Sequence, residues 1–179
     1  MGQTDDRTQG QSSRELTVKL LIFVLGSALI VLLDQLTKAW AVRTLAGNGS
    51  RVLIPGVLQL TYTENAGIAF GLLQNRQWFF VILTVIVLLF IVYLVYRMRL
   101  NRRFAPLFTA LVFLTGGAVG NMIDRIAHRY VVDFIYFSLI DFPVFNVADI
   151  FVTVSCIALI LMFIFLYKDE DLERFVPAG

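Results

Sequence analysis

Residues 78–96 read WFFVILTVIVLLFIVYLVY, and this stretch decides the class of fold because it contains no charged side chain. As a helix, about 20 apolar residues span the roughly 30 Å hydrocarbon core of a bilayer. Residues 104–123 and 150–167 are also uncharged, and a fourth apolar run, Leu20–Leu33, continues beyond Asp34. The sequence therefore predicts four transmembrane helices in one membrane domain (20–168), at about 20–42, 78–96, 104–124 and 146–167.

The composition of the 179-residue chain agrees with a membrane protein. Hydrophobic residues make up 58% of the chain and charged residues 16%, against about 25% charged residues in soluble domains. The net charge of +2 is too small for a nucleic-acid-binding surface. One cysteine and one histidine exclude an internal disulfide and a Cys/His metal cluster. We therefore expect no nucleic-acid partner, no metal and no cofactor.

Lysine and arginine are unevenly divided between the two sides of the membrane that four spans create. Nine lie on the side of the two tails and the 97–103 connector, and five lie on the other side. Because segments rich in lysine and arginine stay in the cytoplasm, both termini are expected there. Residues 1–19 are interpreted as a disordered cytoplasmic tail and 169–179 as a second cytoplasmic tail. No small-residue cleavage site follows the first apolar run, which favours a retained helix over a signal peptide.

The segment 43–75, after the first helix, predicts a small extracytoplasmic β-sheet. Val52–Ile54 and Val57–Thr63 are interpreted as strands, and apolar and polar side chains alternate in the second of them. Pro55-Gly56 between them suits a type II turn. The connection between the third and fourth helices is expected to form an outer loop or helix.

Acidic residues are scarce outside the two tails. Between residues 20 and 167 they are Asp34, Glu64, Asp124, Asp133, Asp141 and Asp149. The predicted orientation brings Asp34, Asp124, Asp133 and Asp149 to the extracytoplasmic end of the helices. Because ionisable groups are costly at membrane depth, this gathering indicates a functional site.

Two of these aspartates lie in contrasting surroundings. Asp133 is flanked by apolar residues in VVDFI (131–135), and burial there raises the pKa of a carboxyl group. Asp149 follows Asn146 at the start of the fourth helix, where a capping box and the helix dipole favour the charged form. Two carboxyl groups with separated pKa values can activate water and protonate a leaving amine, which predicts an aspartyl hydrolase. On the residues alone, Asp124 competes with Asp133 as the partner of Asp149.

Structural roles are the alternative interpretation of several of these residues. Asp124 and Arg125 could form an ion pair, as could Asp34 and Lys38, which are four residues apart on one helix face. Asp149 could serve only as a helix cap. The small residues of GGAVG (116–120) are typical of close helix packing.

Two further classes of protein would use the same residues differently. A transporter could relay protons or bind a cation through Asp34, Asp124 and Asp149, a common role of intramembrane carboxylates. However, polar groups gathered at one end of four helices form no path across the membrane. A non-enzymatic scaffold would explain the small residues of the third helix but leaves the Asn-Asp clusters without a role.

Five short motifs occur along the chain. They are DQLTK (34–38), NAGIAF (65–70), GGAVGNMIDR (116–125), VDF (132–134) and FNVAD (145–149). In these motifs, their order and the four predicted spans, the sequence resembles the bacterial lipoprotein signal peptidases, also called signal peptidase II. The resemblance covers nearly the whole membrane part, whereas residues 1–19 and the stretch between VDF and FNVAD match no motif.

The resemblance implies an aspartyl endopeptidase of the bacterial inner membrane, with its active site near the extracytoplasmic face. Such an enzyme removes the signal peptide from diacylglyceryl-modified prolipoproteins by cleaving before the lipidated cysteine. The catalytic pair maps onto Asp133 and Asp149, in preference to Asp124. The prolipoprotein, membrane lipid and globomycin-type cyclic peptide inhibitors are the implied partners, and no metal or cofactor is implied. Supporting or substrate-binding roles map onto Asn65, Gly67, Asn121, Arg125, Asn146, Asp34, Lys38 and Asp124.

Overall fold

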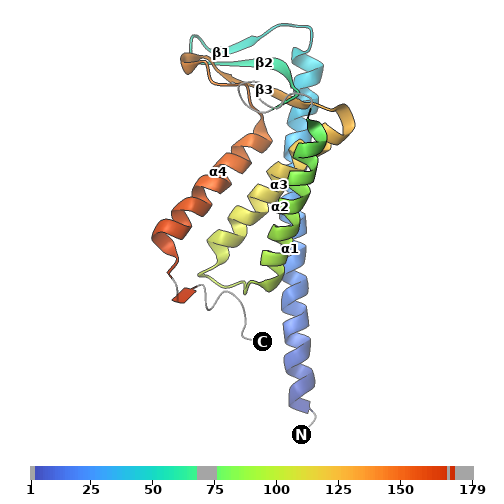
Figure 1. The fold of residues 1–179 in the computed structure, drawn as a ribbon, viewed down its shortest axis with the longest axis vertical. Coiled ribbons are helices and arrows are strands. Elements are labelled where there is room, and N and C mark those ends of the chain that lie inside the picture. Colours follow the sequence, from blue (N-terminus) through green and yellow to red (C-terminus); the bar gives the residue numbers. More distant parts are fainter. Residues whose placement is uncertain (1–2, 68–75, 169, 172–179) are drawn as a thin grey trace.

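The computed structural model describes residues 3–67, 76–168 and 170–171. Four long helices form a bundle, and a small sheet lies across the end of the bundle opposite the N-terminal end of the first helix (Figure 1). The helices are α1 (Gln3–Leu45), α2 (Gln77–Arg97), α3 (Ala105–His128) and α4 (Val147–Leu161), and a π-helical turn, η3 (Met162–Leu166), continues α4.

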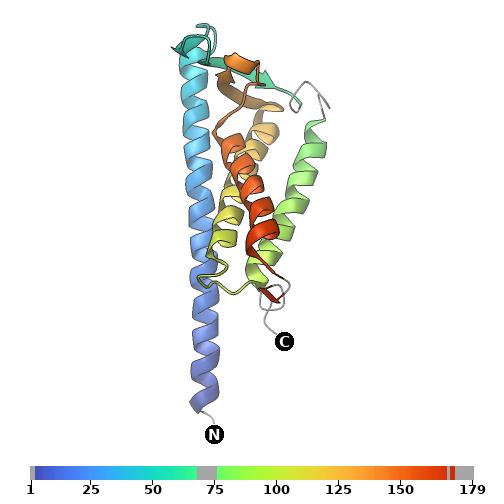
Figure 2. The same ribbon diagram turned by 90° about the vertical axis from the view of Figure 1, so that its left-hand side faces the viewer.

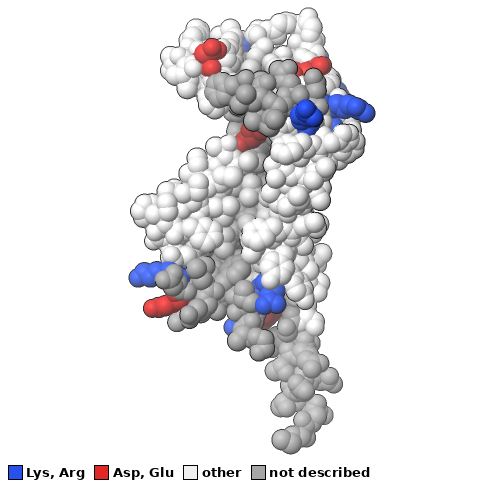
Figure 3. Space-filling model, in the orientation of Figure 1, with Lys and Arg blue, Asp and Glu red and all other residues white. Residues whose placement is uncertain are grey.

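The four predicted transmembrane helices are confirmed. Residues 13–45, 77–97, 105–128 and 147–166 are helical, and each segment is long and apolar enough to cross a membrane. Large apolar side chains on α1, α2 and α4 are exposed on the outside of the bundle, where lipid is as favourable a surrounding as another apolar side chain. Charged side chains on the face shown in Figure 3 lie mainly toward the two ends, with a wide uncharged zone between them.

Helix α1 is longer than the sequence predicted. It begins at Gln3, so residues 3–19 continue the transmembrane helix where a disordered tail was expected. No proline occurs between Gln3 and Leu45, and a helix already nucleated in the membrane elongates at little cost until a residue stops it.

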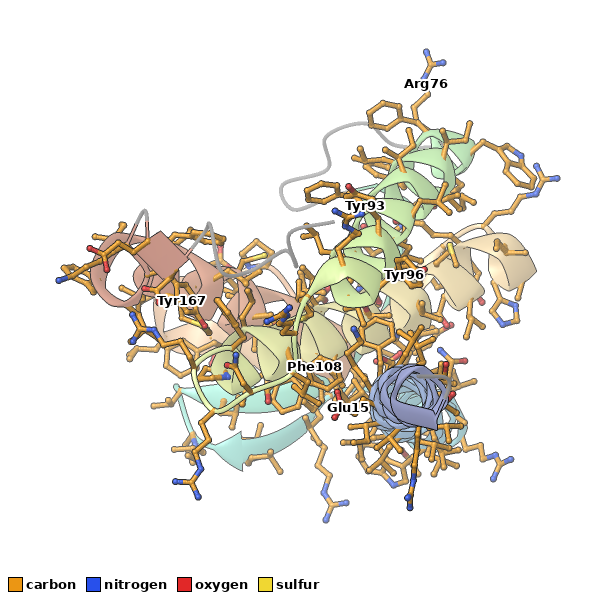
Figure 4. All side chains as sticks on the ribbon, turned by 90° about the horizontal axis from the view of Figure 1, so that it is seen from below. Glu15, Arg76, Tyr93, Tyr96, Phe108 and Tyr167 are labelled. Atoms are coloured by element: carbon orange, nitrogen blue, oxygen red, sulfur yellow. The ribbon has the colours of Figure 1, made fainter. Side chains whose placement is uncertain are left out.

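Helix α3 occupies the centre of the bundle and packs against α1, α2 and α4 (Figure 2). The apolar side chains that it buries form one cluster with neighbouring helices, in which the Phe23 and Phe108 rings are 6.1 Å apart. Phe108 lies on the α1 side of α3 in Figure 4, whereas Arg76, at the start of α2, points away from the bundle. This cluster lies toward the end of the bundle opposite the sheet.

Three glycines on α3 let its neighbours approach closely, as the GGAVG segment predicted. A Cβ atom at Gly116 would lie 2.6 Å from Ile30 Cβ on α1, and one at Gly117 would lie 2.6 Å from the Ala148 carbonyl oxygen on α4. At Gly120, nearer the sheet, it would lie 2.5 Å from Asp34 Oδ2. These three glycines form the glycine stripe of α3. Its neighbour farthest from the sheet is an isoleucine side chain, and its neighbour nearest the sheet is a carboxylate.

The sheet has three antiparallel strands, in the order β1 (Arg51–Ile54), β2 (Leu58–Asn65) and β3 (Val131–Phe137). The first two confirm the predicted hairpin, and Gly56 in its turn has a φ of +71°. The third strand was not predicted: it replaces most of the expected outer loop or helix and leaves only the short 3₁₀ helix η2 (Ser138–Ile140). Residues 131–134 are all buried, and a strand buried on both faces lacks the alternation that reveals strands in a sequence.

Candidate active site

The first carboxylate of the site, Asp149, is positioned by the start of α4. Asn146 is the N-cap residue, and its Oδ1 accepts the Asp149 backbone N–H at 3.0 Å. In return, Asp149 Oδ2 accepts the Asn146 backbone N–H at 3.1 Å. This reciprocal pair is the predicted capping box. The other carboxylate oxygen, Oδ1, accepts a hydrogen bond of 2.8 Å from Asn121 Nδ2 on α3.

The second carboxylate, Asp133, lies on β3 and is 1% exposed. Its Oδ1 accepts a hydrogen bond of 2.6 Å from Asn146 Nδ2, and its Oδ2 accepts one of 2.8 Å from Asn65 Nδ2 at the end of β2. Gly67 supports this arrangement because its backbone N–H donates to Asn65 Oδ1 at 3.0 Å. One side chain, Asn146, therefore contacts both Asp133 and the backbone of Asp149.

Electrostatics separate Asp133 from an ordinary aspartate. Burial and, after it, the negative charge of Asp149 raise the pKa of Asp133 to about 7, while hydrogen bonds from Asn65 and Asn146 oppose the rise. A carboxyl group with this pKa is partly protonated at neutral pH, so it can donate a hydrogen bond or a proton. Because the charge of Asp149 contributes to this raised pKa, the protonation of Asp133 depends on the charge of Asp149.

Behind this pair lies a buried ion cluster centred on Lys38 of α1, whose side chain is 3% exposed. Lys38 Nζ lies 2.8 Å from Asp34 Oδ2 and 3.0 Å from Asp124 Oδ2, and it donates to Asn121 Oδ1 at 2.9 Å. All three ammonium hydrogens thus have acceptors. Asn146 Nδ2 donates to the same Asn121 oxygen at 3.1 Å, so Lys38 and Asn146 together orient this amide with its Nδ2 toward Asp149.

The ion cluster joins elements that are distant in sequence. Asp34 Oδ1 accepts the Ala148 backbone N–H at the start of α4 at 3.0 Å. Asp124 Oδ2 accepts the Val132 backbone N–H on β3 at 3.1 Å. The cluster therefore connects α1 and α3 to the backbone beside each of the two aspartates of the pair.

One expected ion pair is absent from the part of the chain that the structure describes. Asp124 pairs with Lys38 rather than with Arg125, because consecutive residues of a helix do not face each other. The Arg125 guanidinium instead lies 5.1 Å from the centre of the Phe80 ring on α2, and its Nη1 donates to the Asn121 carbonyl oxygen at 3.3 Å. The expected Asp34–Lys38 pair is confirmed.

Sequence reasoning missed one side chain and two backbone groups of the site. Gln35 Nε2 donates to Asp124 Oδ1 at 2.9 Å and lies 3.2 Å from the Gly120 carbonyl oxygen. A glutamine within an apolar span is a signal that could have identified it. The N–H groups of Val132 and Ala148 carry no such signal, since every residue except proline has one. Among the described residues, no group of three or more histidine, cysteine or acidic side chains could hold a metal ion.

Comparison with known proteins identifies the family. The signal peptidase (SPase) II family matches residues 26–165, well over half of the chain. The chain belongs to the signal peptidase II family. Lipoprotein signal peptidases of Streptococcus pyogenes serotypes M1 and M5 (strain Manfredo) are each 44% identical to it over 155 residues, which cover 86% of this chain and 98% of theirs.

Solved structures agree with this assignment. Two that are described as bacterial membrane enzymes, at 2.3 and 1.9 Å resolution, superpose on this signal peptidase II with TM-scores of 0.69. Their sequences are 30% and 33% identical to it, and the matches cover 88% and 80% of this chain and 93% and 92% of theirs. The chain is therefore a multi-pass membrane peptidase of lipoprotein processing, and the resemblance drawn from the five motifs is confirmed.

Proposed function

We propose that this signal peptidase II is an aspartyl endopeptidase in which Asp133 and Asp149 activate one water molecule. Its substrate is a diacylglyceryl-modified prolipoprotein, cleaved before the lipidated cysteine. The observation that carries the proposal is the convergence of these carboxylates on Asn146, although one comes from β3 and the other from α4. The pKa of about 7 for Asp133 gives the pair one member that can carry a proton.

In the proposed reaction, ionised Asp149 removes a proton from water, and the water oxygen forms a bond to the scissile carbonyl carbon. Protonated Asp133 polarises the carbonyl oxygen during this attack. As the C–N bond breaks, Asp133 gives its proton to the leaving amine. The proton held by Asp149 then passes to Asp133 within the pair, which restores the starting state.

The remaining predicted site residues have supporting roles in this proposal. Asn65 and Asn146 orient Asp133, and Asn121 orients Asp149. Gly67 holds Asn65, and Arg125 binds the substrate backbone. Asp34, Lys38 and Asp124 keep the elements that carry the pair in register.

We further propose that the sheet end faces the extracytoplasmic side of the bacterial inner membrane, with both termini in the cytoplasm. The connector between α2 and α3 carries Arg97, Arg99, Arg102 and Arg103, and arginine-rich connectors stay cytoplasmic. In this orientation the diacylglyceryl chains of the substrate lie in the outer leaflet, and the scissile bond reaches the depth of Asp133 and Asp149.

The test of the catalytic pair is cleavage of a purified diacylated precursor by Asp133→Asn and Asp149→Asn variants. We expect each to lose about 100-fold to 10,000-fold in turnover, the usual contribution of general acid or base catalysis. Asp141→Asn is the matched control, because Asp141 is an exposed aspartate at the same end and Asn tolerates its φ of 51°. Near-native turnover in either variant of the pair, with a native melting temperature, would remove that residue from the chemistry.

A second experiment tests the substrate class. The enzyme is given the same precursor with and without its diacylglyceryl group, and globomycin is added in a parallel reaction. We expect cleavage of the lipidated form alone and inhibition by the cyclic peptide. Equal cleavage of both precursors would contradict the proposed substrate class but not the catalytic pair. Ion flux in liposomes without cleavage would instead support the transporter interpretation.

A further inference from the structure

A cavity lies between α2 and α3, at the sheet end of the bundle, in addition to the Asp133–Asp149 pair. Its volume is about 180 Å³, several times the roughly 30 Å³ that one water molecule takes up in the liquid. It is lined by Gln77, Trp78, Val81, Arg125, Ile126 and Arg129. The lining thus combines an amide, two guanidinium groups and apolar side chains.

Two buried polar atoms in this lining have no hydrogen-bond partner among the described residues. Gln77 is 7% exposed, and its Nε2 donates to the Ala66 carbonyl oxygen at 2.5 Å. That hydrogen bond fixes the amide, and leaves its Oε1 without a donor. Arg125 Nε is also buried without an acceptor. An occupant that satisfies both atoms must therefore bring an acceptor for Arg125 and a donor for Gln77.

The charge of the lining is positive. It contains no acidic side chain. Arg125 interacts electrostatically with Asp124, Asp133 and Asp149. Arg129 forms no ion pair with any described acidic residue. The first turn of α2 carries no acidic residue and no side-chain cap, so its free N–H groups add positive potential. The cavity is suited to an anion.

The position of the cavity points to lipid as the source of that anion. It lies at the ends of two transmembrane helices, where lipid headgroups meet water. Trp78 is 64% exposed, and tryptophan is typical of this interface. Below the polar part, Val81 and Ile126 offer an apolar surface to an acyl chain. These features together fit one phospholipid better than a soluble anion.

We propose that this cavity binds an anionic phospholipid whose headgroup carries a free hydroxyl, as in phosphatidylglycerol. The phosphate accepts hydrogen bonds from Arg125 and Arg129, and the hydroxyl donates to Gln77 Oε1. A phosphatidylethanolamine headgroup would place its ammonium group beside two guanidinium groups, and phosphatidylcholine offers Gln77 no donor. The lipid site shares Arg125 with the proposed substrate-binding residues, but it includes neither Asp133 nor Asp149.

The test uses the two tryptophans of the chain, Trp40 and Trp78. Trp40→Phe leaves the cavity tryptophan as the reporter, and Trp78→Phe leaves Trp40 on α1 as the control. Each full-length variant is reconstituted in phosphatidylcholine vesicles that contain brominated phosphatidylglycerol, phosphatidylethanolamine or phosphatidylcholine at equal mole fraction. We expect Trp78 fluorescence to report about fivefold preference for phosphatidylglycerol, the equivalent of about 1 kcal/mol for one basic residue at an anionic lipid. Trp40 is expected to show no such preference.

Two substitutions in the Trp40→Phe background complete the test. Arg129→Asn removes the exposed charge while keeping a residue that tolerates its φ of 66°, and we expect it to abolish the preference. Gln77→Leu removes the acceptor for the hydroxyl, and we expect it to reduce the preference. Equal quenching of Trp78 by all three lipids, or a preference that survives Arg129→Asn in a protein with native circular dichroism, would overturn the proposal.

Discussion

Helix α1 buries one lysine at each end of the bundle, and the two lysines are held in different ways. Lys38, near the sheet, contacts the carboxylates of Asp34 and Asp124. Lys19, near the opposite end, donates to the backbone carbonyl oxygens of Tyr96 and Met98 at 3.0 and 2.7 Å. The first contacts are between charged side chains, whereas the second join a charged side chain to backbone carbonyl groups at the C-terminal end of α2.

The surroundings of the two lysines differ in the same way. Around Lys19 the bundle is held by the apolar cluster that includes Phe23, Val95 and Phe108, which tolerates the loss of a polar contact. Around Lys38 a smaller apolar cluster, which includes Ala41, Leu45 and Phe134, lies beside buried polar groups that depend on one another for hydrogen-bond partners. Partly satisfied polar networks are costly. The geometry of the sheet end therefore depends on polar contacts, whereas the opposite end is held mainly by the larger apolar cluster.

The largest expected effect comes from removing the charge at the sheet end. Lys38→Met leaves two buried carboxylates without a counter-ion, which costs about 3–5 kcal/mol in a buried ion pair. The Asn121 amide loses one of its two donors and is held less firmly against Asp149, and a 1 Å displacement can cost about 100-fold in rate. Thermal unfolding in detergent and precursor cleavage measure the two effects. Lys19→Met is the matched control, for which we expect about 1–3 kcal/mol from the orphaned carbonyl groups and native cleavage. Equal loss of cleavage in both variants would contradict the contrast.

Alanine substitutions in the glycine stripe of α3 test the same difference between the two ends, because each adds a single methyl group. Gly116→Ala presses on Ile30, and Gly120→Ala presses on the Asp34 carboxylate. Both are expected to cost about 1–3 kcal/mol, as overpacking usually does. Only Gly120→Ala is expected to slow cleavage, because it displaces the ion cluster that contacts the backbone beside the proposed catalytic pair. Cleavage rates measured well below each variant's melting temperature separate the two outcomes, and a slower Gly116→Ala enzyme would contradict this account.

The sheet end should also make the protein sensitive to pH. In the proposed reaction Asp133 acts in its protonated form, and its pKa is raised to about 7, so cleavage is expected to fall as pH rises above about 7. Between about pH 4 and pH 7 the folded state keeps this proton while the unfolded state, with a pKa of about 3.9, loses it. The contribution of Asp133 to the free energy of unfolding therefore decreases as pH rises through this window. The melting temperature should decrease as pH rises from 4 to 8, and Asp133→Asn should make this decrease smaller. An unchanged decrease in the variant would contradict the raised pKa of Asp133.

The smallest effect is expected at the end opposite the sheet. Arg103 Nη2 lies 2.7 Å from Asp171 Oδ2, and the Arg103 side chain is 43% exposed. An exposed ion pair contributes little to stability, so Arg103→Gln should change the melting temperature little and leave cleavage unchanged. A loss as large as that of Lys38→Met would show that charges stabilise both ends equally.

The parts of the site that could be predicted are those encoded by neighbouring residues. The capping box of Asn146 and Asp149 has a local spacing, and the Asp34–Lys38 pair lies on one turn of α1. The family motifs also named Asp133, but no local pattern placed it on a strand. Likewise, Asp124 was expected to form an ion pair with its neighbour Arg125, whereas in the structure it pairs with Lys38 from another helix.

The sequence alone determined the four transmembrane helices. Long apolar stretches favour the lipid bilayer, and there a single segment satisfies its own backbone hydrogen bonds as an α-helix. The tertiary structure decided which polar groups meet. Strand β3 pairs with β2 in a register that sets Thr63 opposite Asp133, and α3 brings Asn121 between Lys38 and Asp149. These contacts join residues far apart in the chain, and their geometry depends on packing that no single segment encodes.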